Sequence, residues 1–231
     1  MLKRYVLIVE DEMILARDIQ MKLEKMGYSV AGIADSRDRA IAILEENKEI
    51  DLVLMDIVIK GDIDGIQTAG EIRHRMDIPV VFLTAYSDDN TVKRAEVSDP
   101  YGYILKPVQD REFSIAIEIA LYKHELQKNL KREKDFIYSI LDSFDVGIIT
   151  IDVNNKIKYL NTQASFITGW NIEEAAGREF EEVADLKSSG RDGEAVFINR
   201  KKEEIKVDYK KSPIVDRNGE NTGSVFFISV K

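Results

Sequence analysis

The sequence contains no cysteine, only two histidines and one tryptophan, and no long uninterrupted hydrophobic run. Without cysteine, the 231-residue chain has no disulfide, no thiolate nucleophile and no sulfur ligand for a metal. Its apolar runs fall well short of the ~20 residues of a membrane span, and the N-terminus lacks the cleavage site of a signal peptide. A net charge of −9 argues against nucleic acid as the main partner. These absences predict a cytoplasmic protein. At 231 residues, the chain is long enough for two domains of about 100 residues each.

The first half of the chain alternates strand-like and helix-like segments. Apolar runs of strand length recur, and between them apolar residues follow the three- and four-residue spacing of a helix face. Strands are expected at residues 5–9, 28–34, 52–55, 79–84 and 101–105, each followed by a helix, the fourth of which is a short one at about 88–97. Because each parallel crossover needs a helix of about this length, the pattern predicts an α/β fold with a parallel sheet.

Polar side chains stand at the ends of four of these strands. Asp56 follows the apolar run at residues 53–55, and Gly61 and Gly65 then break the pattern. The other polar groups are Glu10, Asp11, Thr84 and Lys106. In a doubly wound sheet the carboxyl ends of the strands share one edge, where ligands bind. We therefore expect these groups to converge there.

The segments at those strand ends resemble the receiver domain of two-component response regulators. The matches are VEDE at 9–12, MDI at 55–57, DG at 64–65, LTA at 83–85 and GYILKP at 102–107. The resemblance covers residues 1–122 and implies a flavodoxin-like (βα)5 receiver of the CheY-like type, with strand order 2-1-3-4-5. It also implies a cis peptide bond between Lys106 and Pro107.

For phosphoryl chemistry, the resemblance assigns Asp56 as the acceptor of a phosphoryl group from a partner histidine kinase. Lys106 would place a positive charge opposite the phosphoryl oxygens, and Thr84 would supply a hydroxyl donor. Tyr103 would turn inward as Thr84 moves. Taken singly, Thr84 and Lys106 are also compatible with solvated strand ends, and Tyr103 with an ordinary half-buried strand residue.

The resemblance also implies a Mg²⁺ site. Carboxylates only a few ångströms apart repel one another unless a hard divalent cation joins them, and Mg²⁺ prefers one or two carboxylates plus waters and phosphate oxygens. Asp11 and Asp56 would be direct ligands together with the backbone carbonyl of Val58. Glu10 would hold a metal-bound water.

Two positions in the receiver pattern bear on how long the acyl phosphate lasts. In receivers, the residues two beyond the acceptor and two beyond the threonine flank the path of the hydrolytic water. Here they are Val58, which cannot hydrogen-bond a water through its side chain, and the bulky Tyr86. This pair predicts slow hydrolysis, since a lost positioning contact costs about tenfold or more in rate. Side chains that point away would leave an ordinary lifetime.

Two other segments match known functional motifs only in part. Residues 60–71 follow an EF-hand calcium loop in part, but Lys60 occupies the position of the first acidic ligand. The HEL sequence at 124–126 is similar to the phospho-accepting helix of histidine kinases. It lacks the following proline, and no glycine-rich ATP-binding segment comes after it.

The helical pattern that begins near residue 109 continues without Gly or Pro through a charged linker at residues 123–136. Apolar residues along it follow a mixed three- and four-residue spacing: Ile119, Leu126, Leu130, Ile137, Ile140 and Phe144. Lys123 and Glu133 interrupt this seam. The pattern favours a long helix that pairs with its twin in a homodimer, although a solvated single-helix linker is also compatible with it.

After residue 144 the pattern changes to the alternation of strands, and residues 137–231 resemble a PAS domain. The matching segments are GIITID at 147–152, KIKYLN at 156–161, FITGW at 166–170 and the closing hairpin at 212–230. The resemblance implies an α+β sensor fold with a five-stranded antiparallel sheet. Between Gly177 and Gly193 little chain remains for the helix that walls the ligand cavity in this family.

Known PAS cofactors can be compared with the residues present. Both histidines, His74 and His124, lie outside the PAS segment, which excludes haem ligated by histidine there. A cysteinyl flavin adduct is excluded as well. An empty cavity, a small-molecule cavity or a purely protein-binding PAS domain remain as alternatives. The alternating segment at 201–211 is expected to be an exposed strand face, not a DNA-binding patch.

These features predict a phosphorelay response regulator that signals through its PAS module by protein contacts and has no enzymatic output. One alternative is the N-terminal sensory fragment of a hybrid histidine kinase. An alternative from another class is an aspartyl-phosphate phosphatase that uses Asp56. Such enzymes need a second acid two residues after the nucleophile, and Val58 stands there.

Overall fold

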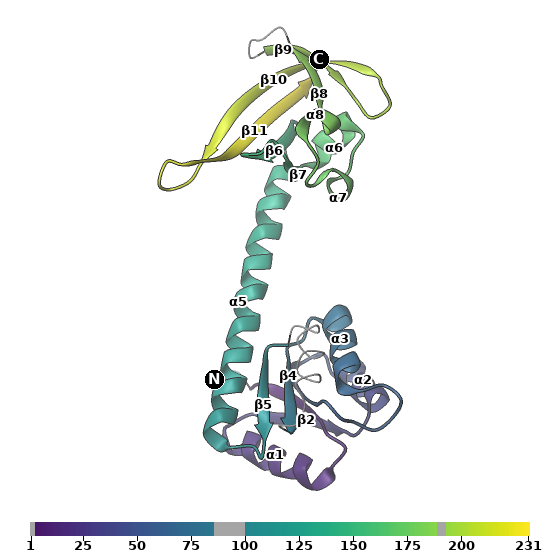
Figure 1. Cartoon of the computed structure of the whole chain (residues 1–231), viewed down its shortest axis with the longest axis vertical. Helices are drawn as coiled ribbons and strands as arrows, with labels where there is room; N and C mark the ends of the chain where they lie inside the picture. The colour runs from purple at the N-terminus through teal and green to yellow at the C-terminus, as the bar shows by residue number, and fades with distance from the viewer. Residues whose placement is uncertain (1–2, 86–99, 189–192) are drawn as a thin grey trace. The chain divides into compact units, whose positions relative to one another are not determined.

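The computed structural model describes residues 3–85, 100–188 and 193–231 of the chain. The chain divides into two compact units, Met1–Leu130 and Lys131–Lys231 (Figure 1). Among the described helices, none is both long and apolar enough to cross a membrane.

The first unit is an alternating α/β structure. Its five-stranded parallel sheet has the order β2-β1-β3-β4-β5, which confirms the predicted flavodoxin-like topology. The strands are β1 Tyr5–Val9, β2 Ser29–Ala34, β3 Ile50–Asp56, β4 Val80–Ala85 and β5 Gly102–Lys106. The helices are α1 Met13–Lys25, α2 Arg37–Glu46, α3 Gly65–Met76 and the start of α5 at Asp110. The helix predicted near residues 88–97 lies outside the described residues.

Helices cover both faces of this sheet, so its central strands are apolar on both sides. Leu44 of α2 and Ile72 of α3 pack into the core on one face, together with Val53 and Phe82 of the strands. On the other face, α1 and α5 enclose a second core, which is built on alternate residues of the same strands (Figure 1). This double burial explains why the strands read as nearly continuous apolar runs in the sequence.

Helix α5 spans Asp110–Asp142, which is 33 residues. Phe113, Ile117 and Ala120 are its buried residues, and they belong to the core of the first unit. At the amino edge of the sheet, Arg4 donates to Asp51 at 2.8 Å and lies 3.5 Å from Glu125 of α5. The boundary between the two units, after Leu130, falls inside this helix.

The second unit is built on an antiparallel sheet. Its strands are β6 Gly147–Asp152, β7 Ile157–Leu160, β8 Asp185–Ser188, β9 Gly193–Ile198, β10 Glu204–Val215 and β11 Asn221–Val230. They are arranged in the order β7-β6-β11-β10-β9-β8. The sheet therefore has six strands where five were expected, because Asp185–Ser188 pairs with β9 at the edge. The alternation in this short segment was too brief to predict a strand.

Short helices pack on one face of that sheet. They are α6 Thr162–Thr168, α7 Ile172–Ala175 and α8 Phe180–Val183. Ala164 and Ile167 of α6 and Phe180 of α8 are buried with the inward residues of the strands. The rings of Phe180 and Phe226 stack at 4.2 Å in this core. The second unit thus has the predicted α+β character, with only short helices between β7 and β9.

Candidate functional site

The carboxyl edge of the parallel sheet brings three carboxyl groups together. Glu10 and Asp11 follow β1 directly, and Asp56 is the last residue of the neighbouring strand β3. One carboxylate oxygen of each lies within 4.8 Å of the others. Glu10 and Asp56 are only 1% and 7% exposed, so two of these acids sit at a largely dry strand end. Residues separated by 46 positions in the sequence meet because adjacent parallel strands end at the same edge.

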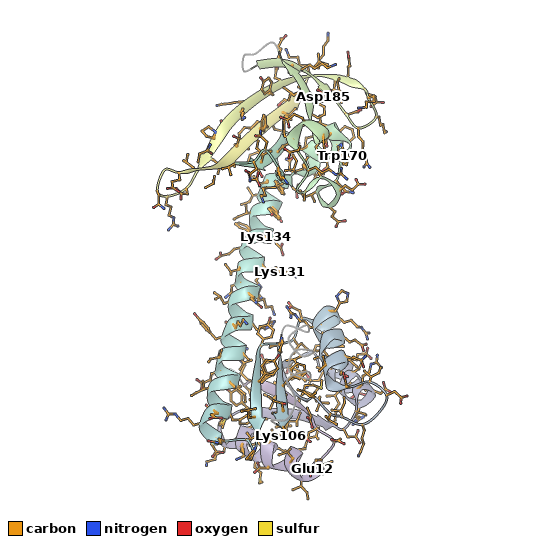
Figure 2. The ribbon with its side chains drawn as sticks, in the orientation of Figure 1. Glu12, Lys106, Lys131, Lys134, Trp170 and Asp185 are labelled. Atoms are coloured by element: carbon orange, nitrogen blue, oxygen red, sulfur yellow. The ribbon has the colours of Figure 1, made fainter. Side chains whose placement is uncertain are left out.

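Lys106 at the end of β5 reaches the same place. Its Nζ donates to Asp56 Oδ2 at 2.7 Å and to Glu10 Oε2 at 2.8 Å. Figure 2 shows Lys106 and Glu12 at the same end of the first unit, and the Glu12 backbone N–H points to Glu10 Oε1 at 3.4 Å. A cation, two carboxylates from other strands and a third nearby acid therefore form one cluster.

The electrostatics of the cluster follow from burial and charge. Burial raises the pKa of Glu10, as does the charge of Asp56, while the hydrogen bond from Lys106 works in the opposite direction. Burial works to lower the pKa of Lys106, but its hydrogen bonds to Asp56 and Glu10 prevail and raise it. Lys106 is therefore an ammonium at neutral pH. Lys106 pairs with two of the three carboxyl groups, and the cluster is an acid-rich set of hard oxygen donors that suits a divalent cation such as Mg²⁺.

Thr84 and Tyr103 stand on the neighbouring strands β4 and β5, where Thr84 pairs with Leu105 and Tyr103 with Phe82. Asp56 pairs with Leu83 in the β3–β4 ladder, so Thr84 stands one residue beyond the level of the acid. Thr84 is 9% exposed, and its hydroxyl donates to the Ala85 carbonyl at 3.3 Å. Tyr103 is 37% exposed, and its ring centroid lies 5.9 Å from that of Phe82. The Lys106–Pro107 peptide bond is cis, as predicted.

The loop after β3 wraps closely around Asp56. The Val58 backbone N–H donates to Asp56 Oδ1 at 3.2 Å, while the Val58 side chain is 72% exposed. A Cβ on Gly65 would lie 1.9 Å from the Asp56 carbonyl oxygen, so only glycine fits there. The DG signal at 64–65 is visible in the sequence, but the contact that demands glycine is not. Tyr86, the second residue of the predicted hydrolysis pair, lies outside the described residues.

A second polar cluster, which sequence reasoning missed, holds the C-terminal end of α5 within the second unit. Asp142 Oδ1 accepts from the Thr162 backbone N–H at 2.7 Å, from the Thr162 hydroxyl at 2.9 Å and from the Tyr159 hydroxyl at 3.4 Å. The Asn161 amide donates to the carbonyls of Leu141 and Val146 at 3.0 and 2.8 Å. An aspartate at the end of a charged helical pattern carries no sequence signal that distinguishes this role.

Asn161 does more than cap α6. Its Oδ1 accepts from the backbone N–H of Ala164, which is the expected cap, and also from that of Ile148 in β6, both at 2.8 Å. The side chain is fully buried; its hydrogen bonds with Ile148 and Ala164 are buried, and those with Leu141 and Val146 are partly buried. Asn161 thereby joins three elements, namely the end of α5, the start of β6 and the start of α6.

Comparison with known proteins agrees with both halves of this description. Residues 6–118 match the response regulator receiver domain family, and residues 135–188 match the PAS fold. The phyllosphere-induced regulator PhyR of Methylorubrum extorquens is 32% identical over 117 residues, which is 51% of this chain and 43% of PhyR. The transcriptional regulatory protein PdtaR of Mycobacterium tuberculosis is 36% identical over 118 residues, or 51% of this chain and 57% of PdtaR. The chain thus spans about half the length of the curated relatives it matches.

Solved structures resemble the first unit. One is the N-terminal domain of a response regulator/sensory box/GGDEF three-domain protein from Carboxydothermus hydrogenoformans, with 35% identity and a TM-score of 0.50 over 54% of this chain and 98% of that one. Another is the signal receiver domain of a modulated diguanylate cyclase from Desulfovibrio desulfuricans. It has 34% identity and a TM-score of 0.51, over 54% of this chain and 98% of that one. With its receiver sheet, the acidic edge and the antiparallel second unit, the chain belongs to the response regulators and carries a receiver domain followed by a PAS domain.

Proposed function

We propose that this chain is a phosphorelay response regulator that accepts a phosphoryl group on Asp56 from a histidine kinase. The observation that carries the proposal is the position of the Lys106 ammonium, 2.7 Å from Asp56 Oδ2 and beside the carboxylates of Glu10 and Asp11. A nucleophilic carboxylate with a fixed cation beside it is suited to phosphoryl transfer, in which positioning and charge neutralisation dominate. The proposed boundaries are residues 1–122 for the receiver, 123–136 for the linker and 137–231 for the PAS domain.

In the proposed reaction, a carboxylate oxygen of Asp56 attacks the phosphorus of a phosphohistidine. The bond between phosphorus and the imidazole nitrogen breaks, and its electron pair leaves with the imidazole. The product is an acyl phosphate on Asp56. Lys106 then pairs with a phosphoryl oxygen instead of the free carboxylate, and the Thr84 hydroxyl donates to another after leaving the Ala85 carbonyl. Tyr103 follows this movement as the proposed switch residue.

Mg²⁺ is the proposed cofactor, and the donor set fits it. Asp11, Asp56 and the backbone carbonyl of Val58 are the proposed ligands, with Glu10 holding a metal-bound water. All of these are the hard oxygen donors that Mg²⁺ prefers, and the three carboxylates already lie within 4.8 Å of one another. When bound, the ion would neutralise charge on the transferred phosphoryl group.

Exposed apolar side chains beside the acceptor support a protein as the phosphoryl donor. Met13 and Ile14 begin α1 just after the acidic pair, and they are 54% and 85% exposed. Val58, two residues after Asp56, is 72% exposed. A small charged donor would gain nothing from these side chains, whereas a kinase domain could cover them as it delivers its phosphohistidine. The slow hydrolysis predicted from Val58 and Tyr86 stays a prediction.

The proposed output is non-enzymatic and runs through protein contacts of the PAS domain. A receiver followed by a sensory module has a precedent in the three-domain protein named above. Within the second unit, Asn161 and Asp142 tie the last turn of α5 to the chain that follows it. The Asn161 amide donates to the Leu141 carbonyl in a partly buried hydrogen bond, and Asp142 accepts from the Thr162 backbone N–H in an exposed one. This tie offers a route by which a change in the helix could reach the PAS core.

The acceptor assignment can be tested by intact-mass measurement after incubation with Mg²⁺ and phosphoramidate, a small donor with the same P–N bond. One phosphoryl group should be added to the parent chain and none to Asp56→Asn. Asp62→Asn is the matched control, because Asp62 is an exposed acid in the same loop and should leave the modification intact. A mass shift that persists in Asp56→Asn would overturn the assignment.

A further inference from the structure

The hairpin between β10 and β11 ends in a turn at residues 216–220, which we call the Asn-Gly turn. Asp216 Oδ1 accepts hydrogen bonds from the backbone N–H groups of Asn218 and Glu220, at 2.8 and 2.9 Å. The Gly219 N–H donates to the Asp216 carbonyl at 3.1 Å, and Gly219 has a φ of +83°. An asparagine followed directly by glycine occurs nowhere else in the sequence.

The hairpin between β6 and β7 ends in a turn of the same construction, which we call the Asn-Asn turn. Asp152 Oδ1 accepts from the backbone N–H groups of Asn154 and Lys156, at 2.9 and 3.0 Å. The Asn155 N–H donates to the Asp152 carbonyl at 3.1 Å, and Asn155 has a φ of +59°. The two turns therefore hold an asparagine in the same hydrogen-bond pattern, but the residue that follows it is glycine in one and asparagine in the other.

We propose that Asn218 is a site of spontaneous deamidation and that Asn154 is not. Asparagine amides are chemically labile. The backbone nitrogen of Gly219 attacks the side-chain carbonyl carbon of Asn218, and a cyclic succinimide forms. The bond from that carbon to the amide nitrogen breaks, and the nitrogen takes the proton of the Gly219 N–H and leaves as ammonia. Water then opens the ring at either carbonyl, which gives aspartate or isoaspartate at this position.

The residue after the asparagine decides whether this attack succeeds. Both Asn154 and Asn218 are exposed, so water reaches both. Among the described residues, none beyond the chain neighbours has an atom within 4 Å of the place where a Cβ on Gly219 would stand. The Gly219 nitrogen is therefore open to the asparagine side chain, and glycine lets the backbone adopt the geometry of the ring. In the Asn-Asn turn, the Asn155 side chain crowds the corresponding approach.

The hydrogen bonds of the Asn-Gly turn restrain the reaction. The Gly219 N–H must leave the Asp216 carbonyl before its nitrogen can attack, and Asn218 Nδ2 also lies 3.4 Å from Asp216 Oδ2. Deamidation therefore requires local opening of the turn. The product carries a new carboxylate beside Asp216 and Glu220, and isoaspartate also lengthens the backbone by one carbon. The inference concerns the second unit and does not depend on phosphoryl transfer to Asp56.

An exchange of the two neighbours tests the proposal in the full chain. Peptide mapping by mass spectrometry follows each amide during incubation at mildly alkaline pH. The parent should lose the Asn218 amide while Asn154 stays intact. Gly219→Asn should preserve Asn218, and Asn155→Gly should make Asn154 reactive. The first variant suits the backbone, because Asn155 already occupies the equivalent place at positive φ.

An intact Asn218 in the parent would overturn the proposal. Equal rates at the two asparagines, or an unchanged rate at Asn218 in Gly219→Asn, would do the same.

The restraint by the turn has its own test. Asp216→Ala removes the side-chain hydrogen bonds to the backbone of Asn218 and Glu220. It should accelerate deamidation of Asn218 about fivefold, the rate change that corresponds to the loss of one net hydrogen bond. Asp208→Ala, at an exposed aspartate of the same strand β10, is the control and should keep the parental rate. An unchanged or lower rate in Asp216→Ala would show that these hydrogen bonds do not restrain the reaction.

Discussion

Lys106 Nζ lies 2.7 Å from Asp56 Oδ2 and 2.8 Å from Glu10 Oε2, so a single ammonium joins two carboxylates from other strands. The two acids are nearly buried, and such charges are tolerated only when they are paired. The ammonium therefore stabilises the acidic edge and, at the same time, competes with any divalent cation for the same oxygens.

This competition predicts the effect of removing the ammonium. Lys106→Met should bind Mg²⁺ about tenfold more tightly than the parent, because a positive charge within a few ångströms of the ion is lost. Isothermal titration calorimetry measures the change. Lys60→Met is the matched control, since Lys60 is an exposed lysine near the same edge, with its Nζ 3.7 Å from Asp35. Unchanged or weaker Mg²⁺ affinity in Lys106→Met would show that the ion does not use these carboxylates.

The close contact of Gly65 with Asp56 predicts a large effect of one added methyl group. Gly65→Ala would place Cβ 1.9 Å from the Asp56 carbonyl oxygen, which forces the backbone apart. We expect a loss of about 2–4 kcal/mol in the unfolding free energy of the first unit. In the same helix, Gly70→Ala meets no atom within 4 Å and should be neutral or stabilise by about 0.5–1 kcal/mol. Urea denaturation followed by circular dichroism compares the two, and equal stabilities would contradict the contact.

The buried Asn161 side chain predicts a difference between two helix caps in the second unit. Asn161→Ala removes hydrogen bonds that join α5, β6 and α6, and should cost about 2–4 kcal/mol of unfolding free energy. Asn171 caps α7 through a single exposed hydrogen bond from the Glu174 N–H at 2.8 Å. Asn171→Ala should cost only about 0.5–1 kcal/mol. If thermal denaturation found similar losses, the joining role of Asn161 would be refuted.

Tyr159 predicts a loss of stability at alkaline pH. Burial, helped by the nearby Asp142 carboxylate, raises the pKa of Tyr159 from 10.0 to about 12. In the unfolded chain the phenol ionises near its ordinary pKa, while the folded state keeps it neutral. The unfolded state therefore binds fewer protons above pH 10.0, and stability falls as the pH rises towards about 12.

The contribution of the Tyr159 phenol can be separated from that of other titrating residues by chemical denaturation. The unfolding free energies of the parent chain and of Tyr159→Phe are compared between pH 9 and about 12. The parental curve should fall more steeply than that of the phenylalanine variant. Identical slopes for the parent and Tyr159→Phe would exclude a contribution from this phenol.

The order of strands and helices in the first unit could be predicted from the sequence because its central strands are buried on both faces and polar residues stand at four of the five strand ends. Asp56 and Lys106 could be named as site residues for the same reason, since strand ends in a parallel sheet share an edge. The closing hairpin of the second unit could also be predicted, because Asn218-Gly219 stands between two alternating runs. In the structure Gly219 adopts a φ of +83°, a turn conformation that favours glycine.

Other features depended on contacts between distant residues, which local pattern does not encode. The strand Asp185–Ser188 forms because β9 offers an edge to pair with, although its four residues show little alternation. Asp142 and Asn161 acquire their roles because the end of α5 meets the start of β6 and α6. The sequence by itself determined which residue types stand at each strand end. Only the tertiary structure decided that Lys106 binds both Asp56 and Glu10, because hydrogen-bond partners are set by packing across strands rather than by position along the chain.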